Sequence, residues 1–269
     1  MKKLFFMGFA LLLCAMWPAD AAAQLKIGGR KLNTGKLLEA GKDVAKAVTL
    51  SDKDIAQLSC EAVEWMDANN PIADETTEYG ARLKRLTEGI TEINGLPLNF
   101  KVYHVVDVNA FACGDGSIRV FSALMDLMDD DELMAIIGHE IGHVVHADTK
   151  HAMKNAYLAS AARNAAGAAE GSALAKLSQS QLGEVVTAFT GAQFSQKQEY
   201  EADEYGFEFS VKNGFSPYGM GNSLNKLVEL SKGAKSSTVQ KMFSSHPDSE
   251  KRAARMKEKA DAYVAAHQQ

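Results

Sequence analysis

His139-Glu140-Ile141-Gly142-His143 is the stretch of this 269-residue chain that decides its fold, because it sets two histidines four residues apart within a helical pattern. Residues i and i+4 lie one turn apart on the same face of an α-helix, so two imidazoles at this spacing can bind one metal ion. A glutamate beside the first histidine can reach a water molecule on that ion and act as a general base. The stretch therefore predicts a helix that carries a catalytic metal site. The alternative is a pair of solvated histidines on a surface helix.

The residues around this motif predict a well-formed helix. Asp129 and Glu132 have capping-box spacing at its start. Apolar residues then recur at steps of three and four, which is typical of a helix side that faces a core. They are Leu133, Ile136, Ile137, Ile141, Val144 and Val145. The two motif histidines lie beside this stripe. We interpret His146 and His151, which follow, as polar residues near the helix end.

A second motif supplies a third metal ligand. Catalytic zinc usually takes three protein ligands and keeps one position for water. Gln198-Glu199-Tyr200-Glu201-Ala202-Asp203 opens another predicted helix, which ends near Asn213-Gly214. Glu199 and Asp203 share one face of that helix, so one carboxylate can bind the metal while the other accepts the free ring N–H of a ligand histidine. The alternative for this acidic run is a solvated helix face.

The paired motifs resemble a known family. His139-Glu140-x-x-His143 followed by Glu199-x-x-Ala202-Asp203 is similar to the HtpX-type gluzincin metallopeptidases, and within them to the small periplasmic LoiP-like proteins. The resemblance extends from about Leu50 to about Met256 and includes the stretches Asp107–Ala112 and His246-Pro247.

The resemblance implies a role for each motif residue. One Zn²⁺ ion per chain would be bound by His139, His143 and Glu199. Glu140 would be the general base, and Asp203 would stand beside the ligands as an orienting residue that is sometimes proposed as a proton donor. The implied reaction is hydrolysis of an internal peptide bond by zinc-activated water.

His246 is a further candidate, because the resemblance places its His-Pro element near the zinc cleft. It could stabilise the oxyanion of the reaction as a catalytic residue. It could instead occupy the open position of the zinc ion and restrain activity. The third interpretation is a capping histidine before the C-terminal helix.

The expected fold is α+β: a mostly helical zincin (gluzincin) domain with a small β-sheet. Phe100–Val106 and Ser117–Phe121 have the composition of strands joined across a glycine turn. Zincin peptidases bind an extended substrate along the edge of such a sheet. The resemblance places this edge strand, which flanks the zinc cleft, at Asn109, Ala110 and Phe111. A plain turn at a strand end is the alternative.

The first residues have the pattern of a secretory signal peptide. Lys2-Lys3 precede an apolar run from Leu4 to Trp17, and an Ala-x-Ala site ends at Ala23. We therefore expect a signal peptide at 1–23, a loosely packed arm at 24–49 and the metallopeptidase domain at 50–269, with a periplasmic location. Lipid anchoring at Cys14 is a minor alternative, because Leu13 stands where a small residue is usually required. Peripheral association with the envelope membrane stays open.

Removal of the signal peptide leaves two cysteines, Cys60 and Cys113. An even pair in an oxidising compartment predicts a disulfide bond. The alternative is two buried free thiols.

Composition excludes one class of partner. The net charge of −5 comes without a basic patch, so binding of nucleic acid has no support. We interpret the basic C-terminal run Lys251–Lys259 as a solvated helix face.

These observations predict a zinc-dependent endopeptidase of the bacterial cell envelope that acts on extended or unfolded polypeptides. The alternative function is a non-catalytic or latent periplasmic chaperone or assembly factor that retains a zinc site. Intact Glu140 argues against this alternative, since a purely structural site needs no base. The oligomeric state is open.

Overall fold

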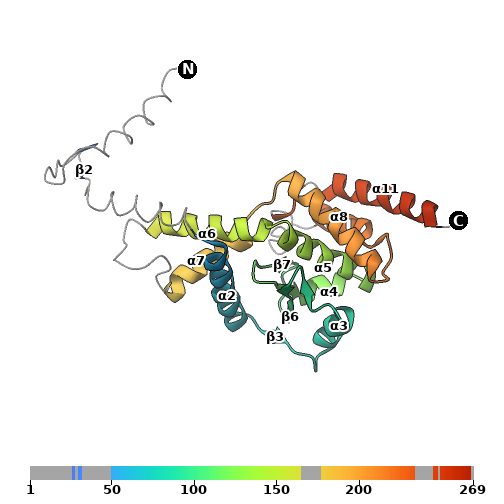
Figure 1. Cartoon of the computed structure of the whole chain (residues 1–269), viewed down its shortest axis with the longest axis horizontal. Coiled ribbons are helices and arrows are strands. Elements are labelled where there is room, and N and C mark those ends of the chain that lie inside the picture. Colours follow the sequence, from blue (N-terminus) through green and yellow to red (C-terminus); the bar gives the residue numbers. More distant parts are fainter. Residues whose placement is uncertain are drawn as a thin grey trace, which may run out of the picture.

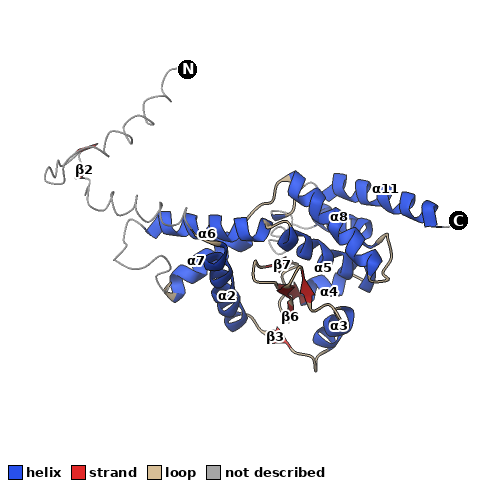
Figure 2. Ribbon diagram, viewed as in Figure 1, coloured by secondary structure: helices blue, strands red, loops and turns tan. Residues whose placement is uncertain are grey.

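The computed structural model describes residues 50–164, 177–233, 245–247 and 249–267, together with a two-stranded ribbon of β1 (Lys26–Ile27) and β2 (Arg30–Lys31). The predicted signal peptide at 1–23, Cys14 and most of the 24–49 arm lie outside the described residues. Within the described part, the fold is α+β and mostly helical, as predicted (Figure 2).

The helices are α2 (Asp52–Asn69), α3 (Glu78–Leu86), α4 (Ser122–Leu127), α5 (Asp130–Val145), α6 (Asp148–Asn164), α7 (Gln179–Thr190), α8 (Gln196–Lys212), α9 (Gly219–Gly233) and α11 (Ser249–His267). The strands of the main sheet are β3 (Ile72–Ala73), β6 (Asn99–Tyr103), β7 (Ala110–Ala112) and β8 (Ser117–Phe121). A separate ribbon joins β4 (Glu92–Ile93) and β5 (Leu96–Pro97).

Helix α5 is central, and it forms as its sequence predicts. The Asp129 side chain accepts from the backbone N–H of Glu132, and the Glu132 carboxylate accepts from the N–H of Asp129, both at 2.9 Å. Every residue from Glu132 to Val144 is buried, because α5 packs between the sheet and helix α8 (Figure 1).

Small residues let α5 and α8 approach closely. A Cβ added to Gly206 on α8 would lie 2.8 Å from the carbonyl oxygen of Ala135, and one added to Gly142 on α5 would lie 3.1 Å from the Cα of Ala202. Neither separation leaves room for a larger residue without movement of the backbone. This contact brings the two predicted metal-binding motifs face to face.

The main sheet has the strand order β3-β6-β8-β7. Strands β6 and β8 pair in parallel, and β7 pairs antiparallel with β8, with Phe111 opposite Arg119. The first predicted strand was too long, since β6 ends at Tyr103 and not at Val106. The prediction that the glycine turn joins the two predicted strands was wrong: it joins β7 to β8, because β6 and β8 run parallel. Strand β7 stands last in the strand order, at the edge of the sheet, and packs against α5.

Three apolar clusters form the core. One lies between the sheet and α5, one joins α2, α6 and α7, and one joins α8, α9 and α11. Among the described residues, none of the helices combines the length and the apolar character needed to cross a bilayer.

Candidate active site

Four buried side chains meet where α5, α8 and the segment before α11 come together. His139 and His143 of α5 have their Nε2 atoms 3.1 Å apart. Glu199 of α8 has Oε1 3.5 Å from His143 Nε2. His246 Nδ1 lies 3.0 Å from Glu199 Oε1 and 3.3 Å from His139 Nε2. The fold therefore joins the two sequence motifs and adds His246 to them.

These four groups fit a zinc ion. Nitrogen and oxygen ligands at about 2.0–2.1 Å from zinc in a tetrahedral arrangement lie about 3.3–3.4 Å from one another. One ligand atom from each of the four residues lies within 4.8 Å of the other three, and all four residues are buried. Three imidazoles and a carboxylate are also the ligand types that zinc prefers. The geometry and the donor set both favour zinc at this position.

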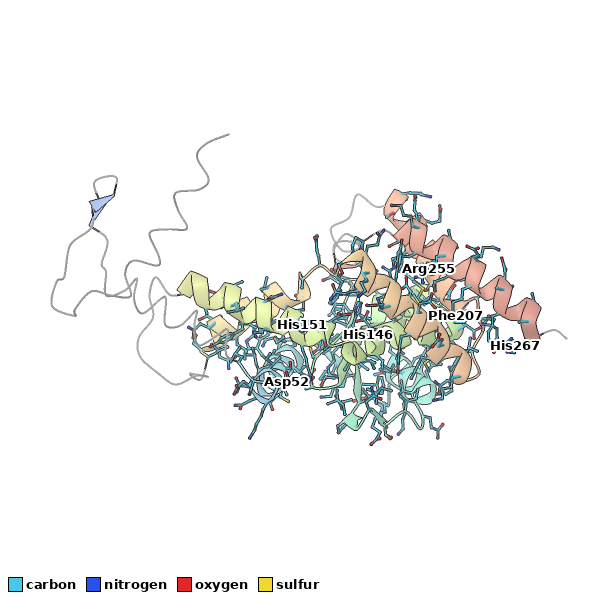
Figure 3. All side chains as sticks on the ribbon, turned by 45° about the horizontal axis from the view of Figure 1, so that its top comes forward. Asp52, His146, His151, Phe207, Arg255 and His267 are labelled. Atoms are coloured by element: carbon cyan, nitrogen blue, oxygen red, sulfur yellow. The ribbon has the colours of Figure 1, made fainter. Side chains whose placement is uncertain are left out.

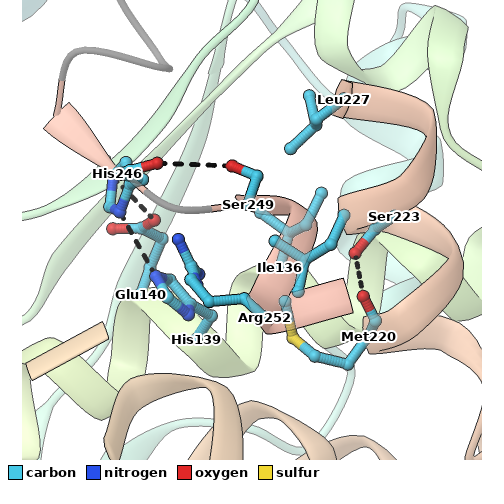
Figure 4. Close-up of a pocket in the computed structure, with 10 residues that line it drawn as sticks. Ile136, His139, Glu140, Met220, Ser223, Leu227, His246, Ser249 and Arg252 are labelled. Atoms are coloured by element: carbon cyan, nitrogen blue, oxygen red, sulfur yellow. Dashed lines mark hydrogen bonds and ion pairs between the residues drawn. The ribbon is translucent and has the colours of Figure 1, made fainter. Parts of the chain in front are cut away.

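Glu140 lies next to the cluster and keeps a free acceptor. The residue is 2% exposed, and its Oε1 atom has no hydrogen-bond partner among the described residues. The same oxygen lies 3.9 Å from Nε2 of His246. A cavity of about 20 Å³ adjoins Glu140, His139, His246 and Arg252. Figure 4 shows these residues together. That volume suffices for one water molecule.

Asp203 lies behind His139, as the resemblance implies. One of its oxygens is 3.0 Å from His139 Nδ1. The carboxylate also accepts from Nε and Nη2 of Arg252, at 2.8 and 2.6 Å. Burial alone would raise the pKa of Asp203, but hydrogen bonds from Arg252 and His139 hold that pKa below its ordinary value. The Asp203 carboxylate therefore faces His139 Nδ1 and is held in place by Arg252.

The interpretation of the basic C-terminal run as a solvated face was wrong for Arg252. This residue is 1% exposed, and its guanidinium pairs with Asp203 and also with Glu199. A buried cation needs such partners. The signal in the sequence was its spacing, because Arg252 shares the buried side of α11 with Met256 and Ala260 at i+4 and i+8.

Two other residues that contact His143 were not predicted from the sequence. Asp148, buried at the start of α6, has Oδ2 2.9 Å from His143 Nδ1. Phe194 stacks on the His143 ring, with centroids 4.0 Å apart, and its backbone N–H donates to the carbonyl of Ser245 beside His246. His146 and His151 are exposed and stand outside the cluster (Figure 3).

The predicted edge-strand residues lie beside the motif helix. Ala110 and Phe111 belong to β7, and Asn109 precedes it, with its carbonyl accepting from Phe121 N–H at 3.0 Å. All three are buried. Strand β7 stands last in the order of the sheet, and the binding role of these residues stays a prediction.

The structure does not contain the predicted disulfide bond. Cys60 is an exposed free thiol on α2 and Cys113 is a buried free thiol after β7. Burial, together with the charge of Asp115, raises the pKa of both thiols. A bond between them stays a prediction for the exported protein.

Known proteins that are similar to this chain include metalloproteases and other proteases. Residues 79–260 match the sequence model of Peptidase family M48. The chain is 40% identical over 249 residues to the metalloprotease LoiP of Escherichia coli (strain K12), which covers 92% of this chain and 97% of that protein. It is 38% identical over 229 residues to the metalloprotease YcaL of the same organism, covering 85% and 88%. The beta-barrel assembly-enhancing protease of that organism is 30% identical over 175 residues, which cover 61% of this chain and 35% of that protein.

The family match covers most of the described domain, and the alignments with LoiP and YcaL cover between 85% and 97% of the chains compared. The resemblance inferred from the two motifs is thereby confirmed. The chain belongs to peptidase family M48 and is a zinc metallopeptidase similar to LoiP and YcaL.

Proposed function

We propose that this metallopeptidase is an endopeptidase of the bacterial cell envelope that cuts internal bonds of unfolded or misassembled proteins. The observation that carries the proposal is the buried cluster of His139, His143, Glu199 and His246 with Glu140 beside it. We assign His139, His143 and Glu199 as ligands of one zinc ion per chain. Bound zinc lowers the pKa of its water to about 7 and polarises the scissile carbonyl.

Glu140 is the base in this mechanism. Its free Oε1 accepts a proton from the attacking water, and the same carboxyl group then delivers that proton to the leaving amine nitrogen. Asp203 lies 3.0 Å from Nδ1 of the His139 ring, and Arg252 holds Asp203. These contacts support a site whose ligands are fixed before substrate binds.

The substrate is an extended chain that adds to the edge of the sheet at β7. A strand of the substrate would pair its backbone with Ala110–Ala112, the last strand in the order of the sheet, next to α5. Backbone pairing requires an extended segment, which a folded protein rarely offers. The edge therefore favours unfolded or misassembled clients.

Two observations support the location and the client class. The signal-peptide pattern at 1–23 supports export to the periplasm. The name of the beta-barrel assembly-enhancing protease refers to the assembly of beta-barrels, and the similarity supports misassembled proteins as clients of this chain.

His246 favours a latent form of the enzyme. Its Nδ1 atom lies 3.0–3.3 Å from the ligand atoms of Glu199 and His139, which is where a fourth zinc ligand belongs. The hydrogen bond from Phe194 N–H to Ser245 holds this segment over the site. We assign His246 as the group that fills the open position until substrate displaces it.

The test compares wild type with Glu140→Gln in cleavage of casein, with zinc content measured in parallel. The variant should retain zinc and lose about 10²–10⁴ in rate. Glu201→Gln is the matched control. Glu201 lies on α8, and its side chain is 45% exposed. Among the ion pairs of the described residues, its only partner is Lys197. Equal cleavage by wild type and Glu140→Gln would refute the role of Glu140.

His246→Ala separates the latent enzyme from the alternative function. A latent protease should gain casein cleavage when the side chain that fills the zinc position is removed. If wild type and His246→Ala both fail to cleave while both bind zinc, the non-catalytic chaperone is the better description.

A further inference from the structure

A chain of hydrogen bonds leads from His143 to the start of helix α8. His143 Nδ1 lies 2.9 Å from Oδ2 of Asp148, and Oδ1 of Asp148 accepts from Nε2 of Gln198 at 2.6 Å. The three residues come from α5, from the first turn of α6 and from the first turn of α8. Asp148 is 5% exposed, so these bonds form in a largely dry environment.

The backbone places Asp148 for this contact. Ala147 adopts a left-handed conformation with φ of 61°, which ends α5 and lets α6 begin at once. Asp148 therefore starts a new helix only five residues after His143 and faces its ring. A non-glycine residue in this conformation is uncommon, which marks the turn as a specific feature of the site.

The orientation of the Gln198 amide is fixed by a second contact. Its Oε1 accepts from the backbone N–H of Ser195 at 2.9 Å and from the Ser195 hydroxyl at 2.8 Å. The amide nitrogen must therefore be the group that faces Asp148. Asp148 then acts as acceptor at both oxygens, which places the proton of His143 on Nδ1 and leaves its Nε2 lone pair directed at the metal position.

We propose that Asp148 and Gln198 are a positioning pair that fixes the tautomer and the orientation of His143. The pair also ties His143 to the helix start that delivers Glu199, the residue after Gln198. The inference rests on the proposed function, in which His143 and Glu199 are zinc ligands. Loss of such a contact typically weakens metal binding by about 10–100-fold.

The donor pattern gives a sharp test. Asp148→Asn replaces one acceptor with an NH₂ group, so either His143 or Gln198 loses its acceptor. Rotation of the Gln198 amide does not help, because its NH₂ group would then face the N–H of Ser195. Adding Gln198→Glu supplies acceptors for both Ser195 and the new amide, and it returns the net charge to that of wild type.

The experiment uses full-length, processed protein and has two readouts besides activity. One is the zinc dissociation constant from competition with a chromophoric chelator. The other is the visible absorption spectrum of the Co²⁺-substituted protein, which reports ligand geometry. Asp148→Asn should bind zinc about 10–100-fold more weakly and change the spectrum. The double variant Asp148→Asn/Gln198→Glu should bind zinc at least tenfold more tightly than Asp148→Asn alone. Its Co²⁺ spectrum should match that of wild type.

A matched control exists in helix α7. Its capping box has the same arrangement, with the backbone N–H of Ser178 donating to Oε1 of Gln181 at 2.9 Å. Gln181→Glu makes the same chemical change far from the metal ligands in the sequence, and it should leave zinc affinity and spectrum unchanged.

Each outcome decides one claim. If His143→Ala releases the metal but Asp148→Asn behaves as wild type, the positioning pair is refuted and the proposed ligands stand. If Asp148→Asn weakens zinc binding and the double variant recovers nothing, the link through Gln198 is refuted. If His143→Ala keeps zinc at wild-type affinity, the ligand assignment itself fails.

Discussion

Asp67→Ala should be among the most destabilising single substitutions outside the metal site. Asp67, near the end of α2, accepts from Nε and Nη2 of Arg119 at 2.8 and 3.0 Å, from Lys101 at 2.7 Å and from the Tyr103 hydroxyl at 2.7 Å. Arg119 is 1% exposed, so removal of Asp67 leaves a buried guanidinium without its counter-charge. Breaking a buried ion pair in this way costs about 3–5 kcal/mol.

The expected change is large enough to measure by thermal unfolding. For a domain of roughly 150–250 residues, each kcal/mol shifts Tm by about 2–4 °C, so the shift should be about 6–20 °C. Glu75→Ala is the control, because Glu75 pairs with Lys84 at the surface, with side chains 66% and 65% exposed. Such a pair contributes about 0–1 kcal/mol. A loss below 1 kcal/mol in Asp67→Ala would refute the reasoning.

The effect of Asp67 should depend on pH. Burial alone would raise the pKa of Asp67, but hydrogen bonds from Arg119, Lys101 and Tyr103 hold it below its ordinary value. A carboxyl group whose pKa is lower in the folded than in the unfolded state stabilises the fold above the unfolded pKa, about 3.9, and loses that contribution as pH falls through the folded pKa. The difference in free energy of unfolding between wild type and Asp67→Ala should be full at pH 7 and shrink below about pH 4. A difference independent of pH would contradict this.

Three further predictions concern the site and its surroundings. Removal of zinc by a chelator should lower Tm, because an ion that binds only the folded site stabilises the folded state and its removal ends that contribution; an unchanged Tm in calorimetry would count against a bound metal. Gly206→Ala should lower both stability, by about 1–3 kcal/mol, and zinc affinity, since its Cβ would lie 2.9 Å from the backbone nitrogen of His139 and push α8 away from α5. Cys60 and Cys113 should form a disulfide bond in exported protein, so thiol counting under denaturing, non-reducing conditions should find neither free.

Local sequence signals were sufficient for the two motif helices, α5 and α8, but not for every site residue. The capping box at Asp129 and the apolar stripe after it determine α5 within one stretch of chain, which is why that helix could be predicted. The assignment of Glu199, and not Asp203, as the ligand beside His143 came from family resemblance, because periodicity does not state which side chains of two helices touch. Asp148 was missed because the left-handed turn at Ala147 has an alanine where glycine would have signalled it.

Arg252 shows a different difficulty. A run of charged residues indicates a solvated helix. A single cation of the run can nevertheless face the core when a buried carboxylate pairs with it. That carboxylate, Asp203, lies on another helix, and the sequence between them does not reveal the contact.

Strand β7 is only three residues long, and two of them are alanines. So short an edge offers few backbone groups, which protects the protein from pairing with its own copies. The short length of β7 also affects product release. A fragment left after cleavage would share only a few hydrogen bonds with β7, and each contributes about 0.5–1.5 kcal/mol net. Products should therefore leave quickly, and short peptides should inhibit the enzyme weakly.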